Sequence, residues 1–224
     1  PVRKNHERRR EMNSPMKKTG AQLLGLLGMA SLLSYTAAVV FAPLAYPNYN
    51  WMAQAVSDLS ADSAPSRQLW SQLAALYMPC DVVCCTLCAL EVRCHFNRTL
   101  RLGVYLFAAM NWISAVGYAM FPLSGAGLPE GFQNVMHLVI TAAVVLLSIA
   151  SLALIIAGGL HGRACRSLAI WAAAMLALML LGAIGTVALP AAYFGIPERF
   201  SVFAATIFNA VLGIYLFRGF EARR

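Results

Sequence analysis

The sequence has very little charge. Only 12% of its 224 residues are Asp, Glu, Lys or Arg, and just nine are acidic, whereas 60% are hydrophobic. A typical soluble domain has about 25% charged and about 45–50% apolar residues. The shortage of charge therefore excludes an ordinary soluble domain, and the excess of apolar residues indicates a chain whose solvent is lipid.

Motifs that identify many hydrolases and metalloenzymes are also missing. The chain contains neither G-x-S-x-G nor H-E-x-x-H, which mark a nucleophilic serine and a zinc-binding histidine pair. No set of four His and Cys residues has the spacing that a zinc site requires. We therefore expect no metal and no cofactor, and the sequence does not favour an enzyme.

Cysteine is absent from the loops predicted to lie outside the cell. The six cysteines are Cys80, Cys84, Cys85, Cys88, Cys94 and Cys165. Cys85 and Cys88 form a C-x-x-C pair, as in thiol oxidoreductases, but they fall in the inner half of a predicted span, away from the oxidising face. Cys80, Cys84 and Cys88 share one helix face, so we interpret them as small packing residues.

Six long apolar runs make up most of the chain. They cover residues 20–45, 69–92, 103–122, 133–157, 168–190 and 200–217. Crossing about 30 Å of hydrocarbon takes about 20 helical residues, and an open strand would leave backbone groups unpaired in lipid. The pattern predicts an all-α integral membrane bundle of six transmembrane helices, arranged as three consecutive helical hairpins.

Lys and Arg are divided unevenly between the two ends of these runs. Fifteen of the 17 lie in residues 1–19, 93–101, 163–166 and 218–224. The opposite loops hold only Arg67 and Arg199. Short cytoplasmic loops carry the excess of basic residues, so we expect both termini in the cytoplasm and the protein in the inner membrane of a bacterium or archaeon. The same distribution accounts for the net charge of +8 without a nucleic-acid partner.

The chain divides into three segments: a basic, disordered cytoplasmic tail at 1–19, a six-helix transmembrane domain at 20–218, and a cytoplasmic tail at 219–224. Met16 followed by two lysines is typical of a bacterial start, so residues 1–15 are either part of the tail or an extension of the reading frame. The first run is longer than the apolar core of a signal peptide, about 7–15 residues. We therefore predict an uncleaved first helix.

Three polar residues fall near the middle of the predicted bilayer. Asp81 lies in the second span, Asn111 in the third and Asn209 in the sixth. Ionisable residues at this depth are costly and are functional candidates by default. We predict a polar cluster inside the bundle, which serves either as a proton, cation or ligand site or as a hydrogen-bonded contact between helices.

A second group of polar residues is predicted on the outer side. Ser57 and Asp58 lie in the loop at 46–68, His137 opens the fourth span, and Glu198 precedes Arg199 at the start of the sixth. Each also has a simpler interpretation, because an acid after Pro is ordinary in the first turn of a helix. A neutral histidine can likewise bond to a neighbouring helix.

Several short motifs together resemble a known family. They are Tyr49 to Ser60 (YNWMAQAVSDLS), Phe121-Pro122, Met136-His137, and Gly195 to Phe200 (GIPERF). In this respect the chain is similar to the domain of unknown function 998 family of bacterial and archaeal multi-pass membrane proteins. The resemblance covers roughly residues 20–218. It implies a six-helix membrane protein, brings no established activity, and directs attention to Ser57, Asp58, His137, Glu198 and Arg199.

Three functions remain open at this point. The first is an outward-facing polar site that binds or moves a lipid headgroup or small solute, lined by Asp58, His137, Glu198 and Arg199 above Asp81. The second is an accessory or structural membrane protein without chemistry of its own. The third is an intramembrane lipid-modifying enzyme, in which Ser57, Asp58 and His137 supply the nucleophile and the acid-base groups. The expected partners are membrane lipid and either a second copy or another membrane protein.

Overall fold

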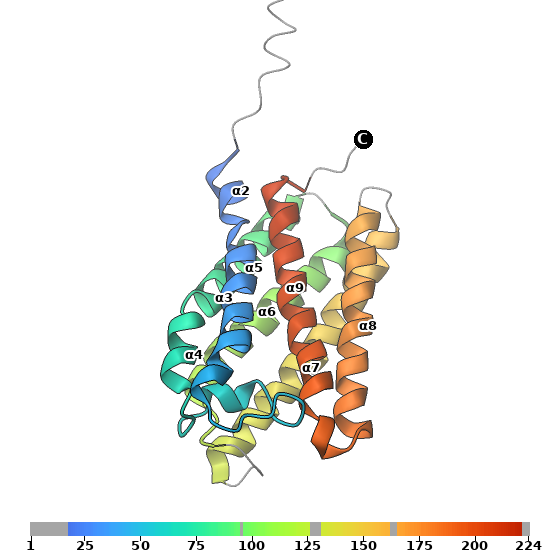
Figure 1. The fold of residues 1–224 in the computed structure, drawn as a ribbon. Helices are drawn as coiled ribbons and strands as arrows, with labels where there is room; N and C mark the ends of the chain where they lie inside the picture. The colour runs from blue at the N-terminus through green and yellow to red at the C-terminus, as the bar shows by residue number, and fades with distance from the viewer. Residues whose placement is uncertain (1–17, 95, 126–130, 162–164, 221–224) are drawn as a thin grey trace, which may run out of the picture.

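The computed structural model describes residues 18–94, 96–125, 131–161 and 165–220. Its α-helices are α2 (Gly20–Leu24), α3 (Leu27–Phe41), α4 (Arg67–Leu73), α5 (Tyr77–Glu91), α6 (Arg98–Met120), α7 (Gly131–Leu160), α8 (Arg166–Ala188) and α9 (Gly195–Phe217). Short 3₁₀ turns follow at Ala42–Ala45, Ser57–Ser60, Val92–Cys94 and Ala191–Tyr193. The helices lie side by side as one bundle, and no strand occurs in these ranges (Figure 1).

The predicted six spans are confirmed. Six helical segments are long and apolar enough to cross a membrane: Gly20–Ala45, Arg67–Glu91, Arg98–Met120, Gly131–Leu160, Arg166–Ala188 and Gly195–Phe217. Their bounds differ from the sequence prediction by a few residues at the ends. The arrangement as hairpins and the side on which each terminus lies stay predictions.

The final helix is the centre of the bundle. Half of the apolar window of α9 is buried, against 28–39% for the other five spans. It packs against α8 on one side and against α3 and α5 on the other, while α6 runs along α7. Phe208 of α9 meets Phe107 of α6 edge to face, with 5.1 Å between the ring centroids. Residues on the inner faces of α3, α5 and α6 therefore all point toward α9.

The second span is interrupted just before Pro79. Proline has no N–H and clashes with the carbonyl four residues earlier, which is Ala75, and the chain is non-helical between α4 and α5. The interruption frees the carbonyl of Leu73, because the N–H of Tyr77 donates to Ala74 instead. Ser34 of α3 donates to that freed carbonyl at 2.6 Å. A hydroxyl from the neighbouring helix thus restores the lost hydrogen bond, as a membrane interior requires.

The first span is interrupted at Gly25, where it crosses α9. A side chain at Gly25 or Gly213 would collide with the backbone of the other position. Gly28, one turn further along α3, also lies close to the backbone of α9, because a Cβ there would come within 2.9 Å of the carbonyl oxygen of Asn209. Glycine is needed at these positions because the two backbones lie in direct contact.

One end of the bundle is covered by the long connection between α3 and α4. Figure 1 shows this connection folded across the end of the bundle beside the start of α9, while α2 and the end of α9 lie at the opposite end. The N–H of Gly195 donates to the carbonyl of Met52 at 2.8 Å, joining the connection to α9. This covered end is the one predicted to face outward.

Candidate functional site

Arg199 fastens the outer connection to α9. Its Nη1 donates to the carbonyls of Trp51 (2.7 Å) and Gly195 (2.7 Å), and more weakly to that of Gln54 (3.2 Å). Its Nη2 donates to the Tyr49 hydroxyl at 2.8 Å. The described ion pairs do not include one between Arg199 and its neighbour Glu198. The guanidinium is instead used to hold residues 49–55 in place.

The two outer carboxylates are also held by this connection. Glu198 is half-buried, and its Oε2 accepts from the N–H of Val56 at 3.2 Å. The Oδ2 of Asp58 accepts from the N–H of Ala55 at 3.1 Å. Both carboxylates interact electrostatically with Arg199 and with each other. Three of the residues selected from the sequence, Asp58, Glu198 and Arg199, are therefore together at the outer end.

Burial shifts the titration of two groups in the connection. Desolvation raises the pKa of Asp58 above its ordinary value. The N–H of Ala55 and the charge of Arg199 lower the pKa, but they offset the effect of desolvation only in part. Desolvation likewise raises the pKa of Tyr49, against the opposing effect of Arg199. Partial removal from water thus outweighs the favourable contacts of the ionised forms.

A second polar cluster lies deep in the bundle, around Asp81 on α5. Asp81 is 2% exposed. Its Oδ1 accepts from the Nδ2 of Asn209 at 2.6 Å and from the hydroxyl of Ser31 at 3.4 Å. Among the described residues no cation pairs with Asp81. The Oδ1 of Asn209 is buried and has no hydrogen-bond partner, so the cluster retains one unused acceptor.

The predicted cluster of three residues is only partly formed. Asp81 and Asn209 are in direct contact, as expected, but the Nδ2 of Asn111 donates to the carbonyl of Phe107 on its own helix at 3.0 Å. Asn111 is nonetheless 7% exposed and lies on the inner face of α6, with Ser114 on the next turn. It contributes to the polarity of the interior without bonding to Asp81.

No described hydrogen bond or ion pair joins His137 to Asp58 or Glu198. One ring nitrogen, Nδ1, lies 2.9 Å from the carbonyl of Phe121, and the ring stacks on Tyr118 with 4.8 Å between centroids. The side chain is 9% exposed. The Tyr118 hydroxyl bonds to Thr141, one turn from His137 on α7. His137 therefore forms a structural contact between α6 and α7 in this arrangement.

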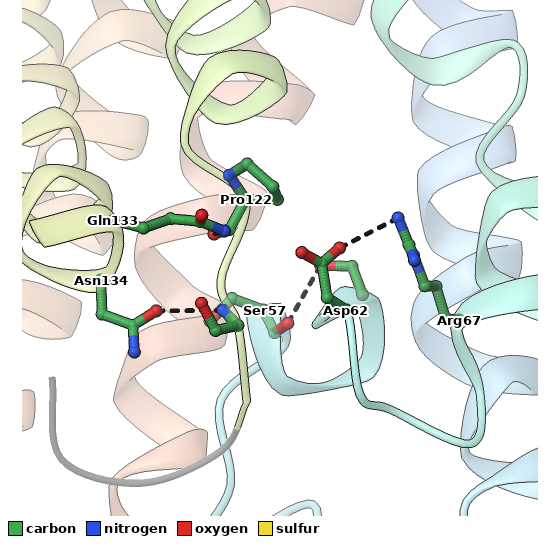
Figure 2. A network of polar contacts seen from close by, with 8 residues as sticks. Ser57, Asp62, Arg67, Pro122, Gln133 and Asn134 are labelled. Atoms are coloured by element: carbon green, nitrogen blue, oxygen red, sulfur yellow. Dashed lines mark hydrogen bonds and ion pairs between the residues drawn. The ribbon is translucent and has the colours of Figure 1, made fainter. Parts of the chain in front are cut away.

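Ser57 belongs to a junction between two outer connections. The N–H groups of Asp62 and Ser63 donate to the carbonyls of Leu123 and Ser124 at 2.8 and 3.2 Å. Asn134 accepts from the N–H of Ser124 at 3.0 Å. Figure 2 shows Ser57 in this junction, together with the ion pair of Asp62 and Arg67 at 2.9 Å.

The enzyme hypothesis required Ser57, Asp58 and His137 to act on one another. No hydrogen bond in the described ranges joins Ser57 to either, and the Asp58 carboxylate accepts from Ala55. His137 bonds to Phe121. A serine becomes a nucleophile only with a base in hydrogen-bond reach, so the geometry does not favour this chemistry.

Aromatic residues that the sequence did not single out connect the two carboxylate groups. Tyr35 is 4% exposed and its ring lies 4.5 Å from that of Tyr77. Tyr35 interacts electrostatically with Glu198, and Tyr77 with Asp81. Two phenols in contact with each other therefore interact with the carboxylates of both clusters. Tyrosine is common in membrane proteins as an interfacial anchor, so its presence alone gave no signal.

The cysteines are buried and unoxidised where the structure describes them. Cys80, Cys84, Cys85, Cys88 and Cys165 are free thiols. Cys84 packs between Gly25 and Asn209, whose carbonyls lie 3.8 and 3.9 Å from its sulfur. No group of three or more His, Cys, Asp or Glu in the described segments is arranged to hold a metal ion.

Comparison with known proteins gives a family and no activity. Neither the curated proteins nor the solved structures include a significant match to the chain. A family profile described as "Protein of unknown function (DUF998)" matches residues 29–215, which include all of α4 to α8 and nearly all of α3 and α9. The chain, a six-helix protein with the architecture of a multi-pass membrane protein, therefore belongs to the DUF998 family.

Proposed function

We propose that this protein binds a small polar solute or a lipid headgroup at its outer end and moves it, or a proton with it, toward Asp81. The observation that carries the proposal is the buried carboxyl of Asp81. It lies inside an apolar bundle without a cation from the described residues, beside an unused acceptor of Asn209.

Helix packing alone does not require a carboxyl at this position. An ionisable group at membrane depth is costly by about 2.5–3.5 kcal/mol or more, whereas an asparagine would accept from Asn209 and Ser31 equally well. The carboxyl adds the capacity to gain and lose a proton. The Oδ1 of Asn209 adds an acceptor for a donor that the described residues do not supply. Together they suit a proton or a ligand N–H or O–H group.

Electrostatic interactions between neighbouring residues support a route from the outer end. Glu198 and Asp58 give the outer end two carboxylates beside one guanidinium. Tyr35 interacts electrostatically with Glu198 and Tyr77 with Asp81, and the rings of the two tyrosines lie 4.5 Å apart. Phenol hydroxyls both donate and accept hydrogen bonds, so they can lower the cost of moving a polar group between the two carboxylates.

The test is transport by purified protein in liposomes. A pH-sensitive dye inside the vesicles reports proton movement after an imposed pH step, and Asp81→Asn is compared with Asp62→Asn. The second variant makes the same chemical change at an exposed outer ion pair. We expect Asp81→Asn to abolish the flux and Asp62→Asn to retain it. Equal flux in the two variants, or none above empty vesicles in the wild type, contradicts the proposal.

The choice between a solute and a headgroup needs a second measurement. Mass spectrometry of lipid retained by the purified protein identifies a headgroup ligand if a stoichiometric lipid is lost in Glu198→Gln. If lipid content is unchanged in that variant while the flux falls, the ligand is a water-soluble solute.

One observation favours the second candidate, an accessory membrane protein. The guanidinium of Arg199, which the sequence placed in the binding site, is used to hold the protein's own connection. In that case the connection held by Arg199 would serve as a rigid surface for a membrane partner. Wild-type flux in Asp81→Asn, together with co-purification of a stoichiometric protein partner from native membranes, would favour this function.

A further inference from the structure

The opposite end of the bundle carries an exposed basic hollow. It is lined by Arg98, Arg101, Leu102 and Tyr105 of α6 and has a volume of about 360 Å³. Residues three, four and seven positions apart share one face of a helix, so all four side chains lie on the same side of α6. None of them belongs to the outer site or to the cluster around Asp81.

Neither arginine in the hollow is neutralised by the described residues. The only described ion pair, between Asp62 and Arg67, lies at the other end of the bundle. Arg101 donates from Nη1 to the carbonyl of Arg93 at 3.0 Å. This bond fixes the guanidinium and leaves its other N–H groups available. Arg98 is exposed at the first position of the helix.

The position of the hollow matches the boundary of the membrane. α6 has 23 residues, about 34 Å at 1.5 Å per residue, slightly more than the hydrocarbon thickness of about 30 Å. Arg98 and Arg101, at its start, therefore lie at the level of the phosphates. Leu102 is 48% exposed and Tyr105 is 37% exposed, and both lie on the side that continues into the hydrocarbon.

We propose that this hollow is a binding site for one anionic phospholipid of the leaflet on the basic side of the protein. The planar guanidinium of Arg101, with that of Arg98, binds the phosphate through paired N–H groups. Leu102 and the Tyr105 ring contact the start of an acyl chain. Basic pockets of this kind on the cytoplasmic side of transmembrane helices recognise anionic headgroups.

A membrane lipid fits the hollow better than a soluble anion does. A free phosphate or nucleotide needs polar surroundings, but half of the lining consists of exposed apolar or aromatic side chains. The combination of two fixed positive charges above an apolar surface matches a molecule that is anionic at one end and apolar at the other. The site is independent of the transport proposal, because it lies at the other end of α6 from the outer connection.

Native mass spectrometry of the delipidated full chain in detergent tests the site. Dioleoylphosphatidylglycerol is titrated against dioleoylphosphatidylcholine, and the double variant Arg98→Gln/Arg101→Gln is compared with Arg166→Gln/Arg218→Gln. The control removes the same charge from exposed residues of α8 and the end of α9. We expect the first variant to lose about 30-fold in affinity for phosphatidylglycerol, since each basic residue near an anionic lipid contributes about 1 kcal/mol.

The control variant is expected to bind phosphatidylglycerol as the wild type does. Arg101→Lys keeps the charge and removes the paired donors, so it should show an intermediate loss; it also tests the site if the double variant does not fold. Equal losses in the two double variants, equal binding of phosphatidylcholine by the wild type, or displacement of the lipid by excess inorganic phosphate would overturn the proposal.

Discussion

Asp81 and Arg199 are both charged residues of a membrane bundle, but their surroundings differ. Three N–H···O bonds from the Arg199 guanidinium to backbone carbonyls and one to Tyr49 occupy most of its donors. The side chains described around Asp81, those of Ser31 and Asn209, both donate to its Oδ1. Arg199 therefore stabilises the connection through its hydrogen bonds, whereas the carboxyl of Asp81 can still bind a ligand or a proton.

The bond between Asp81 and Asn209 should contribute measurably to stability. A double-mutant cycle of Asp81→Ala and Asn209→Ala is expected to give a coupling of about 1–2 kcal/mol, at the upper end of measured side-chain bonds in membrane proteins. Unfolding in a titration of denaturing detergent measures it. A coupling of zero would show that the contact of 2.6 Å adds nothing to the fold.

Arg199→Lys should loosen the outer connection without unfolding the bundle. Lysine cannot bond to Trp51, Gly195 and Tyr49 at once, because its donors sit on a single nitrogen. Loss of about two charge-assisted bonds, discounted for partial exposure, is expected to cost about 2 kcal/mol of local stability. Hydrogen exchange of residues 49–55 should then be about 30-fold faster, while exchange in α6 and α7 stays unchanged as the internal control.

Asp58 predicts a pH dependence of stability. Because burial raises its pKa in the folded state, the folded protein holds the proton more tightly than the unfolded chain does. Its contribution to stability is therefore greatest below the ordinary aspartate pKa, about 3.9, and falls as the pH rises through the higher folded value. Above that value the loss is complete and constant.

Asp58→Asn should remove this dependence. The amide oxygen still accepts from Ala55 and carries no charge to desolvate, so the variant is expected to match the wild type in acid and to equal or exceed it at neutral pH. Thermal unfolding between pH 4 and pH 8 in detergent measures the difference. If the wild type instead gains stability relative to Asp58→Asn as the pH rises, the predicted direction of the pH dependence is wrong.

At this scale the sequence predicted part of the candidate site. A carboxyl within an apolar run must face the bundle interior, so the contact of Asp81 with an amide of another span was predictable. Ser31, Tyr35 and Tyr77 were not, because hydroxyls and phenols occur throughout membrane helices. The roles of Arg199 and His137 depend on backbone carbonyls from distant segments, and no pattern of side chains in a sequence indicates those.

Among the helices, the crossing of the first span and α9 depends on glycine. A Cβ at Gly213 would overlap the carbonyl of Gly25 and lie 3.0 Å from the Cys84 sulfur. Gly213→Ala is therefore expected to destabilise the protein by about 1–3 kcal/mol, as overpacking does. Gly20→Ala is the control, since nothing lies within 4 Å of its Cβ position. Comparison of their unfolding temperatures tests the prediction, and equal values would show that the crossing relaxes freely.

The sequence predicted that the six spans are helices. It could indicate only one of the two interruptions within them. Long apolar runs without paired charges leave no alternative to a transmembrane helix. A proline within an apolar run disrupts the helix before it, and the structure interrupts the second span at residues 74–76, less than one turn before Pro79. The interruption at Gly25 arises from contact with Gly213, which is distant in sequence, so local composition could not locate it.

For the whole molecule, the division of Lys and Arg predicts which side each end faces. In a cysteine-free variant, single cysteines at Asn50 and Asp62 should react from outside the cell with a membrane-impermeant maleimide. Cysteines at Asn97 and Arg218 should react only after the membrane is permeabilised. If the cysteines at positions 50 and 97 react from the same side, the predicted orientation is wrong. The outer carboxylates would then not face the side that the transport proposal requires, or the basic hollow would lie in the other leaflet.

The serine bond that bridges the interrupted second span has a mechanical consequence. Because the hydroxyl of Ser34 occupies the Leu73 carbonyl, α4 is joined to α5 through a third helix as well as through the chain. A change in the angle between α4 and α5 at residues 74–76 would keep the Leu73 carbonyl bonded only if α3 moved together with α4. If α3 and α4 moved together in this way, Ser31, one turn away on α3, would be displaced relative to Asp81.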